Sequence, residues 1–246
     1  MGFDVAALAG KRILVTGAGR GIGRCCAESC ARLGAEVIAV ARTSADLESL
    51  AAGGDGRIRT WVLDVTSEAL VDRVRELDRL DGLVNNAGTN RVGPMAEQSA
   101  DNLDAVLALN VRSVYRIAQA AIPALRRAGG GSIVNMSSQM GHVGSPGRTL
   151  YCMSKHAVEG LTRAMAVELA EEGIRVNSVA PTFVLTPMTR PMLDDPEFHR
   201  FVMDMIPMKR LAAPEDVANA CVYLLSDLSA STTGTSLRVD GGWTAR

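Results

Sequence analysis

Tyr151 and Lys155 stand four residues apart in the stretch YCMSKHAVEGL, which has the pattern of a helix that begins near the tyrosine. At this spacing two side chains share one helical face, with Cβ atoms roughly 5–6 Å apart. A phenol has a pKa near ~10, and a nearby ammonium lowers it by favouring the phenolate. Lowering that pKa by about three units takes roughly 4 kcal/mol. The pair predicts a proton donor and acceptor, although an isolated pair is more often a packed ring beside a solvated charge.

A glycine-rich turn near the N-terminus is the second chemical feature. The segment ILVTGAGRGIGRCC passes from an apolar run directly into a helical pattern. Glycines at such a junction permit a tight turn and a close approach of the backbone to a pyrophosphate, while the helix N-terminus supplies free N–H groups. The context predicts a dinucleotide site. The residues assigned to it are Gly17, Gly19, Arg20, Gly21, Ile22 and Gly23.

Seven short apolar runs alternate with longer helical patterns along the chain. Such strands indicate a parallel sheet that is buried on both faces and connected by right-handed crossovers. We predict an α/β fold, a single doubly wound domain over residues 1–246 with a seven-stranded parallel sheet and helices on both faces. The expected strands are Arg12–Thr16, Glu36–Ala41, Ile58–Val65, Asp81–Gly88, Gly131–Ser138, Ile174–Pro181 and Thr235–Gly242.

The segment 182–211 departs from this alternation, because it is rich in proline and methionine and follows the sixth strand. Open α/β sheets bind ligands at the carboxyl ends of their strands. We therefore expect an apolar flap that covers a substrate. A helical excursion that packs on the body of the domain is the alternative.

Composition and charge argue against several classes of function. The formal net charge of −1 leaves no basic excess for nucleic acid. No apolar run approaches the ~20 residues that cross a bilayer, and the N-terminus MGFDVAALAGKR lacks a signal-peptide pattern, so we expect a cytoplasmic protein without a membrane partner. The cysteines form no C-x-x-C pair and have no metal-ligand spacing with the histidines, so we expect buried free thiols and no metal. They are Cys25, Cys26, Cys30, Cys152 and Cys221.

Together these motifs resemble the short-chain dehydrogenase/reductase family over essentially the whole chain. The matching positions are T-G-x-x-x-G-x-G (Thr16 to Gly23), Asp64-Val65, Asn85-Asn86-Ala87-Gly88, Asn110, Ser138, Tyr151 with Lys155, and Val239-Asp240-Gly241-Gly242. The stretches AVARTSADLESL, NMSSQM and APTFVLT look similar to its L-xylulose reductase and carbonyl reductase subgroup. The resemblance implies a Rossmann-type fold and an NAD(P)-dependent oxidoreductase that interconverts a carbonyl and a secondary alcohol by hydride transfer.

The resemblance also implies roles for single residues. In the family a tyrosine is the acid/base, a lysine lowers its pKa and holds the nicotinamide ribose, a serine bonds the substrate oxygen, and an asparagine anchors a water in a proton relay. Carried over, these catalytic roles fall on Tyr151, Lys155, Ser138 and Asn110. Ser137 competes for the serine role, but Ser138 has the expected separation from the tyrosine. Gln139 matches a position that contacts hydroxylated substrates, and closing a turn is its alternative role.

Further positions resemble the family's cofactor contacts. Asp64 is expected to accept a hydrogen bond from the adenine amine beside the backbone of Val65. Thr186 and Val184 are expected to meet the nicotinamide carboxamide. The chain reads Pro181-Thr182 where the family usually has Pro-Gly, which leaves the course of the backbone there open. The remaining expected contacts are Asn86, Ala87, Gly88, Pro181, Tyr151 and Lys155.

The end of the second strand bears on the choice of cofactor. Ala41 stands where NAD-preferring folds place a carboxylate, so no charge at this position repels a 2′-phosphate. Arg42 and Arg20 are two cations that could bind that phosphate. We therefore expect NADP(H). The alternative is NAD(H), with Asp46 or Glu48 turned back to the ribose, although both lie a helical turn or more too far along the chain.

The expected substrate is a sugar, a polyol or a small diketone. The alternatives are a 3-oxoacyl-carrier-protein reductase or another acyl or alicyclic carbonyl reductase and, from a different class, a catalytically idle cofactor-binding scaffold. An idle protein would be free to lose Tyr151 or Lys155, and this chain has both. The family usually forms tetramers through the helices that contain Asn110 and Tyr151 and through the C-terminal strand. We expect a homotetramer, which the apolar stretch LTRAMAVELA suits.

Overall fold

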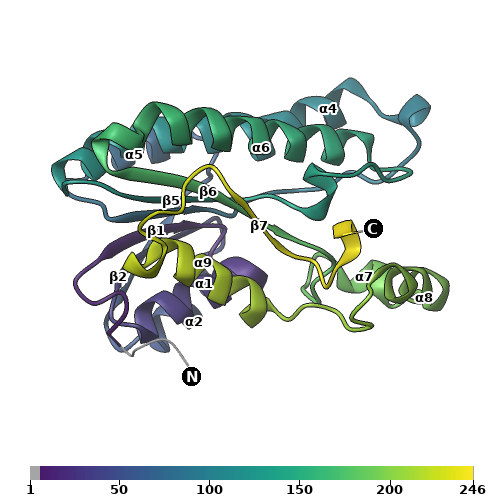
Figure 1. The fold of residues 1–246 in the computed structure, drawn as a ribbon, viewed down its shortest axis with the longest axis horizontal. Helices are drawn as coiled ribbons and strands as arrows, with labels where there is room; N and C mark the ends of the chain where they lie inside the picture. Colours follow the sequence, from purple (N-terminus) through teal and green to yellow (C-terminus); the bar gives the residue numbers. More distant parts are fainter. Residues whose placement is uncertain (1–5, 246) are drawn as a thin grey trace.

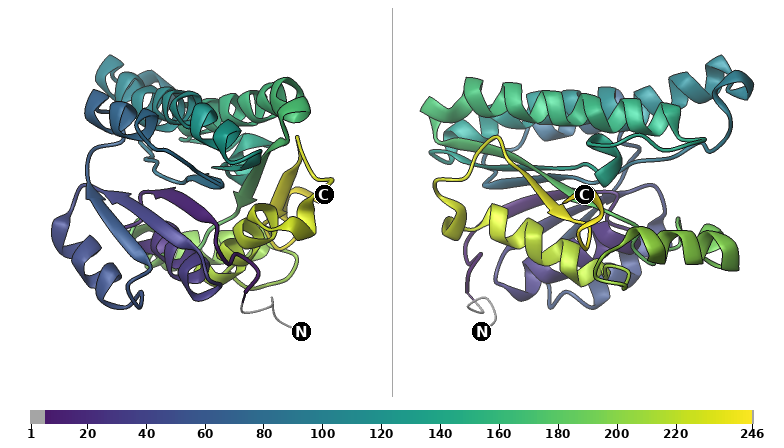
Figure 2. Two further views of the ribbon diagram at one scale, coloured as in Figure 1. Left: turned by 90° about the vertical axis from the view of Figure 1, so that its left-hand side faces the viewer. Right: turned by 45° about the vertical axis from the view of Figure 1, so that its right-hand side comes forward.

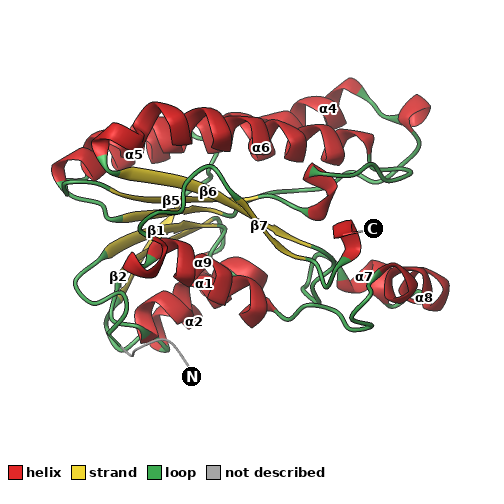
Figure 3. Ribbon diagram, viewed as in Figure 1, coloured by secondary structure: helices red, strands yellow, loops and turns green. Residues whose placement is uncertain are grey.

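The computed structural model describes residues 6–245, so residues 1–5 of the N-terminal stretch and residue 246 lie outside the description. A parallel sheet lies between two layers of helices (Figures 1 and 3). Its order is β3-β2-β1-β4-β5-β6-β7, so the predicted α/β fold with a seven-stranded parallel sheet is confirmed. The strands are β1 (Arg12–Thr16), β2 (Glu36–Ala41), β3 (Ile58–Val62), β4 (Gly82–Asn85), β5 (Gly131–Met136), β6 (Ile174–Pro181) and β7 (Ser236–Val239).

Helices cover both faces of the sheet, as the two turned views of Figure 2 also show. One face carries α1 (Gly21–Arg32), α2 (Ser44–Ala52) and α9 (Pro214–Leu225), and the other carries α3 (Glu68–Arg75), α4 (Ala100–Leu107), α5 (Ser113–Arg127) and α6 (Thr149–Leu169). Neighbouring strand residues point to opposite faces, so Ile13 joins the core under α1 and Leu14 joins the core under α5. Because both faces are buried, the strands are apolar almost without interruption.

Several predicted strands end earlier than the apolar runs suggested. β3 ends at Val62, β4 at Asn85, β5 at Met136 and β7 at Val239. Beyond these ends, side-chain oxygens take backbone donors that a strand would need for pairing. Asp64 accepts from the Thr66 N–H at 2.8 Å, and Ser138 accepts from the Met140 N–H at 3.2 Å. The chain therefore turns at the carboxyl edge while its sequence is still apolar.

The segment 182–211 forms two short helices beyond the carboxyl edge of the sheet, on the right in Figure 1. They are α7 (Arg190–Leu193) and α8 (Pro196–Met205). The Asp195 carboxylate caps α8 by accepting from the N–H groups of Glu197 at 2.8 Å and Phe198 at 2.9 Å. A separate apolar cluster joins this segment to the turn after β5 and to the C-terminal turn. Its buried members are Met140, Phe183, Leu193, Val202, Ile206 and Trp243.

The cysteine thiols differ in burial. All five cysteines are free, but the prediction that all are buried is wrong for Cys25 and Cys152, which are partly exposed. Successive helical residues point about 100° apart, so Cys25 cannot share the buried direction of Cys26. No helix within residues 6–245 is long and apolar enough to cross a membrane.

Candidate active site

The predicted site forms where the strand order reverses, between β1 and β4. Open α/β sheets bind ligands at such a point. The glycine turn follows β1, and the turn after β4 closes against it. The Asn86 side-chain N–H donates to the carbonyl of Thr16 at 3.0 Å and to that of Gly17 at 3.3 Å. The Thr16 hydroxyl oxygen accepts from the backbone N–H groups of Asn86 at 3.0 Å and Ala87 at 3.2 Å. These bonds fix the two turns as one wall.

The glycine turn leaves no room for a side chain at Gly17 or Gly23. A Cβ built on Gly23 would lie 2.3 Å from the Gly17 carbonyl oxygen and 2.4 Å from Asn86 Nδ2. Gly17 and Gly21 have φ of 65° and 58°, in the left-handed region that favours glycine. No side chain caps the N-terminus of α1. The turn is therefore a backbone cradle of the kind that binds phosphate groups. Ile22 packs against the core beneath it.

The outer end of the cleft carries charges of both signs. A Cβ on Gly19 would lie 3.3 Å from the Cβ of Ala41 and 3.1 Å from the Cβ of Asp46. The expectation that Asp46 lies too far along the chain is therefore wrong, because the chain after β2 folds α2 back beside the glycine turn. Arg20 is exposed. The Arg42 guanidinium is also exposed and lies 3.7 Å from the Asp64 carboxylate.

Asp64 and Val65, in the turn that follows β3, differ in burial. Burial alone would raise the pKa of Asp64, but hydrogen bonds from the Thr66 backbone and side chain, with the Arg42 charge, hold this pKa below its ordinary value. Asp64 is therefore ionised at neutral pH and available as an acceptor. Val65 is buried in the core on the α5 face.

The inner end of the cleft meets the predicted catalytic residues. A Cβ on Gly88 would lie 3.4 Å from Asn110 Oδ1 and 3.7 Å from Lys155 Nζ. Thr186 lies beside the glycine turn, with its Cβ 3.5 Å from a Cβ built on Gly21. The glycine turn, the turn after β4 and the start of the segment 182–211 thus line one cleft.

The open question at Pro181-Thr182 is answered by the backbone. β6 ends at Pro181, and the Thr182 N–H donates to the Val239 carbonyl at 3.2 Å, so the chain continues beside β7 without the usual glycine. Val184 then pairs with Ala212 in an isolated bridge, and its carbonyl accepts from the Thr189 hydroxyl.

Lys155 and Tyr151 share a face of α6, with Lys155 Nζ 5.5 Å from the centre of the Tyr151 ring. Lys155 is buried, and its ammonium donates to the Met136 carbonyl at 2.8 Å. Burial lowers the pKa of Lys155 to about 8, although the negative charge of Glu159 raises this pKa in part.

The pKa of Tyr151 differs from the prediction. Burial raises the pKa of its phenol, and a hydrogen bond with the Ser138 side chain and the Arg148 charge only partly offset this. The predicted lowering of the phenol pKa by Lys155 is absent from this structure, because burial also lowers the pKa of Lys155 to about 8, so the amine has lost its charge at the pH where the phenol ionises. Ser138 also donates to Gln139 Oε1 at 2.9 Å. The competing Ser137 hydroxyl is buried and has no partner within residues 6–245.

Asn110 lies in a π-helical turn, Ala108–Arg112, between α4 and α5. Such turns are frequent at functional sites. Its Oδ1 accepts from the Thr89 N–H at 2.8 Å, and its Nδ2 donates to the Thr89 carbonyl at 2.9 Å and the Ser154 hydroxyl at 3.0 Å. Ser154 in turn donates to the Tyr151 carbonyl at 2.8 Å. The amide therefore fixes the loop after β4 to the first turn of α6.

A cavity of about 180 Å³ opens beside Tyr151 and Ser138. The segment 182–211 forms one of its walls. The side chains that complete the lining are Asn90, Val92, Gln139, Met140, Arg148, Thr182, Phe183, Met188, Thr189 and Met192. A small molecule in this cavity would meet both the phenol and the serine hydroxyl.

Comparison with known proteins agrees with this geometry. A family model described as "Enoyl-(Acyl carrier protein) reductase" matches residues 17–244. L-xylulose reductase of Bos taurus is 41% identical over 240 residues, which cover 97% of this chain and 98% of that protein. Carbonyl reductase [NADPH] 2 of Sus scrofa is 42% identical over 238 residues, covering 96% of this chain and 97% of that protein. The chain belongs to the short-chain dehydrogenase/reductase family.

A solved structure supports the same assignment. Gluconate 5-dehydrogenase from Burkholderia cenocepacia J2315, in complex with NADP and tartrate, has a TM-score of 0.93 and 30% identity, covering 98% of this chain and 99% of that one. This short-chain dehydrogenase/reductase is accordingly an oxidoreductase, as the sequence predicted. Its likeness to L-xylulose and carbonyl reductases is confirmed as well.

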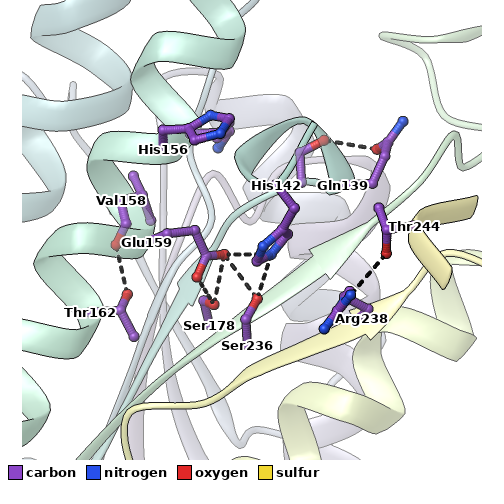
Figure 4. Close-up of polar contacts among 12 residues, drawn as sticks. Gln139, His142, His156, Val158, Glu159, Thr162, Ser178, Ser236, Arg238 and Thr244 are labelled. Carbon is purple, nitrogen blue, oxygen red and sulfur yellow. Dashed lines mark hydrogen bonds and ion pairs between the residues drawn. The ribbon is translucent and has the colours of Figure 1, made fainter. Parts of the chain in front are cut away.

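In this short-chain dehydrogenase/reductase a buried carboxylate, Glu159, ties α6 to the sheet (Figure 4). It accepts hydrogen bonds from Ser178 of β6 at 2.9 and 3.0 Å and from Ser236 of β7 at 2.9 Å. Its Oε1 lies 3.3 Å from Nε2 of His142, which follows the turn after Ser138. The same carboxylate therefore fixes the turn that carries Ser138 relative to the helix that carries Tyr151.

Sequence reasoning missed Arg148, Asn90 and Thr182 of the cavity. Arg148 is the N-cap residue of α6, three positions before Tyr151. That spacing was the one signal in the sequence, since it places the arginine within a helical turn of the phenol. Its burial depends on the segment 182–211, whose packing the sequence does not reveal. Among residues 6–245, no cluster of histidine, cysteine or acidic side chains could hold a metal ion.

Proposed function

We propose that this oxidoreductase interconverts a carbonyl and a secondary alcohol on a small hydroxylated molecule, a sugar, polyol or small diketone, with NADP(H). One observation carries the proposal: Tyr151 and Ser138 lie together in the lining of one small cavity, at its junction with a glycine-lined cleft. A dinucleotide and a substrate can meet at that junction.

The cleft fits a dinucleotide. Its glycine cradle would hold the pyrophosphate at the N-terminus of α1, and Lys155 and Thr186 would hold the nicotinamide end. The bound nicotinamide ring supplies or accepts the hydride. NADP is named for the similar gluconate 5-dehydrogenase, and NADPH for the similar carbonyl reductase. Exposed Arg42 and Arg20, with no acid at Ala41, support the same cofactor here.

Tyr151 moves the proton at the substrate oxygen. In the direction of reduction, its hydroxyl gives a proton to the developing alkoxide while the Ser138 hydroxyl donates a hydrogen bond to the same oxygen. In the direction of oxidation, the phenolate takes the alcohol proton. The Ser138 hydrogen bond and the Arg148 charge lower the pKa of the phenol from the value set by burial. Tyr151 thus works with a pair of neighbours that favour its ionised form.

Lys155 and Asn110 position the groups around the phenol. An ammonium has three N–H donors, and the bond to Met136 uses one, which leaves donors for ribose hydroxyls. Asn110 holds the loop at Thr89 and the α6 backbone near Tyr151, and we assign it the water of a proton relay. Gln139 holds the Ser138 hydroxyl and lines the cavity, so it serves both as a turn residue and as a substrate contact.

A 3-oxoacyl-[acyl-carrier-protein] reductase is the second candidate, favoured by a relative of that name from Thermotoga maritima that is 40% identical over 244 residues. A carrier-bound acyl chain needs an open apolar channel. The cavity here is about 180 Å³ and carries Arg148, Gln139 and Asn90. The small volume and the polar groups among the otherwise apolar lining favour a small hydroxylated substrate.

A substrate panel tests the proposal. The purified protein is assayed with NADP(H) in both directions on sugars and polyols, on small diketones, and on acyl thioesters. We expect the highest kcat/KM among the sugars, polyols or diketones. A higher value for an acyl thioester would overturn the substrate class, and no turnover with any compound would overturn the proposed reaction.

We further propose a cytoplasmic homotetramer of single-domain subunits, residues 1–246, in which the segment 182–211 covers bound substrate. Large apolar side chains exposed on α5 and α6, Tyr115 at 52%, Met153 at 44% and Val167 at 82%, support subunit contact through these helices. Free thiols support a reducing compartment. Sedimentation should give a tetramer, and a monomer at micromolar concentration would contradict the assembly.

A further inference from the structure

Arg148 is a buried cation without a buried anion. Arg148 is 5% exposed, and no carboxylate within residues 6–245 forms an ion pair with its guanidinium. One guanidinium N–H donates to the Met192 sulfur at 3.1 Å. The rings of Phe183 and Phe198 lie with their centres 6.0 Å from its Cζ. A thioether is a weak acceptor and an aromatic face accepts no strong hydrogen bond, so most of the five N–H donors have no strong protein acceptor.

Another partly buried arginine, Arg175, has hydrogen-bond acceptors within the chain. Arg175 donates to the Ser229 hydroxyl at 2.7 Å and to the carbonyls of Ser226 at 3.2 Å and Thr232 at 3.5 Å. Buried polar groups are normally satisfied in this manner, because an unpaired one carries its full desolvation cost. The contrast indicates that the acceptor for Arg148 comes from outside the chain.

The guanidinium faces a site already built for a small molecule. Arg148 lines the cavity of about 180 Å³ beside Tyr151 and Ser138. Two other lining groups, Asn90 Oδ1 and Thr182 Oγ1, are buried and have no hydrogen-bond partner within residues 6–245. Arg148 and two residues that each carry an unsatisfied polar group therefore line one cavity next to Tyr151.

We propose that the substrate is a small hydroxy acid, or the matching oxo acid, whose carboxylate binds Arg148 and whose other hydroxyls meet Asn90 and Thr182. The fork of a guanidinium matches the two oxygens of a carboxylate, and such bidentate pairs are among the strongest hydrogen bonds in proteins. Arg148 then selects the acid over the uncharged polyol of the same length. This inference rests on the proposed carbonyl and alcohol interconversion and, among small hydroxylated molecules, favours those that carry a carboxylate.

Matched substrates and variants test this selection. Oxidation of gluconate and of glucitol, which have equal carbon chains, is followed with NADP⁺ for the wild type, Arg148→Met, Arg148→Lys and Arg190→Met. Methionine keeps an unbranched side chain among Met192 and the two rings, and Arg190 is an exposed arginine of the same wall. The ratio of kcat/KM between acid and polyol is compared, because loss of the Arg148 charge near Tyr151 affects both substrates alike.

We expect the wild type to prefer the acid by about 10- to 100-fold, the range for a charged hydrogen bond. Arg148→Met should bring the ratio near one through a higher KM for the acid, Arg148→Lys should give an intermediate ratio, and Arg190→Met should leave it unchanged. Equal use of both substrates by the wild type, or a ratio that Arg148→Met does not change, would overturn the inference and leave the proposed reaction standing.

A binding measurement separates the two proposals when turnover is absent. Gluconate is titrated calorimetrically into the complex of the protein with NADP⁺, for the wild type and Arg148→Met. Binding that Arg148→Met weakens at least tenfold, without turnover, would overturn the proposed reaction and support the carboxylate site. Binding that is absent, or equally tight in both proteins, would overturn the carboxylate site.

Discussion

The choice between NADP(H) and NAD(H) depends on charges at the outer end of the cleft. A carboxylate at position 41 would stand beside the glycine turn, because the Ala41 Cβ lies 3.3 Å from a Cβ built on Gly19. Arg42 is 74% exposed, and its contact with Asp64 is 3.7 Å long. An exposed pair of this kind contributes only ~0–1 kcal/mol. Little therefore holds the guanidinium away from a 2′-phosphate.

We expect Ala41→Asp combined with Arg42→Ala to reverse the cofactor preference. A charge-assisted hydrogen bond contributes roughly 1.5–3 kcal/mol, so loss of the Arg42 contact lowers kcat/KM with NADP(H) by about 10- to 100-fold. The new carboxylate repels the phosphate and accepts from the ribose hydroxyls of NAD(H). Asp46→Asn should act in the opposite direction, because it removes a carboxylate oxygen 3.4 Å from a Cβ built on Gly19.

The assay is kcat/KM with each cofactor on one substrate, for the wild type, the double variant, Asp46→Asn and the control Arg59→Ala. Arg59 is an exposed arginine of β3 outside the glycine turn. A wild type that uses both cofactors equally would refute the assignment of Arg20 and Arg42 to the phosphate. An unchanged cofactor ratio in the double variant would refute it as well.

Three other substitutions probe the site and its support. Burial lowers the pKa of Lys155 to about 8, so the unfolded chain retains this proton at higher pH than the folded chain does. From pH 8 to ~10.4 the free energy of unfolding should therefore rise in the wild type relative to Lys155→Met, by up to roughly 3 kcal/mol. Parallel pH profiles of the two proteins in urea would disprove this. Gly23→Ala places a Cβ 2.3 Å from the Gly17 carbonyl oxygen and should weaken NADPH binding at least ~10-fold in a fluorescence titration. The control Gly144→Ala has open space around it and should not weaken binding. Equal NADPH affinities of the two variants would exclude the glycine turn as the binding site of the pyrophosphate. Glu159→Ala leaves the Ser178 hydroxyl without an acceptor and leaves the Ser236 hydroxyl with only His142 Nε2, so it should lower the free energy of unfolding in urea by about 1–3 kcal/mol. An unchanged midpoint would argue against its supporting role.

The fold could be predicted because short stretches of sequence show both the alternation of strands with helices and the burial of the strands on two faces. Ile13 and Leu14 point to opposite faces, and each needs an apolar residue, so β1 reads as an uninterrupted apolar run. The ends of the strands could not be predicted from the same signal. They depend on side chains such as Ser138 that capture backbone donors, while the apolar run continues beyond the last strand residue.

The site could be predicted where spacing alone decides the geometry. Four residues on a helix place Tyr151 and Lys155 on one face whatever surrounds them. The pKa of Tyr151 depends on the burial of the phenol and of the Lys155 amine, and spacing along a helix does not reveal burial. Asp46 was misplaced for a related reason, since distance along the chain says little once a turn folds α2 back. Arg148 went unnoticed because a distant segment buries it.

Tyr151→Phe tests the proposed chemistry most directly, because it removes only the hydroxyl that donates and accepts the proton. The ring remains on the same face of α6 as Lys155, so the fold and NADPH affinity should be kept, as measured by a fluorescence titration. General acid/base catalysis contributes about 10²- to 10⁴-fold. We therefore predict a kcat below roughly 1% of the wild-type value with unchanged NADPH affinity. A variant that binds NADPH normally and retains about a tenth or more of the wild-type rate would contradict the role of Tyr151 as the acid/base.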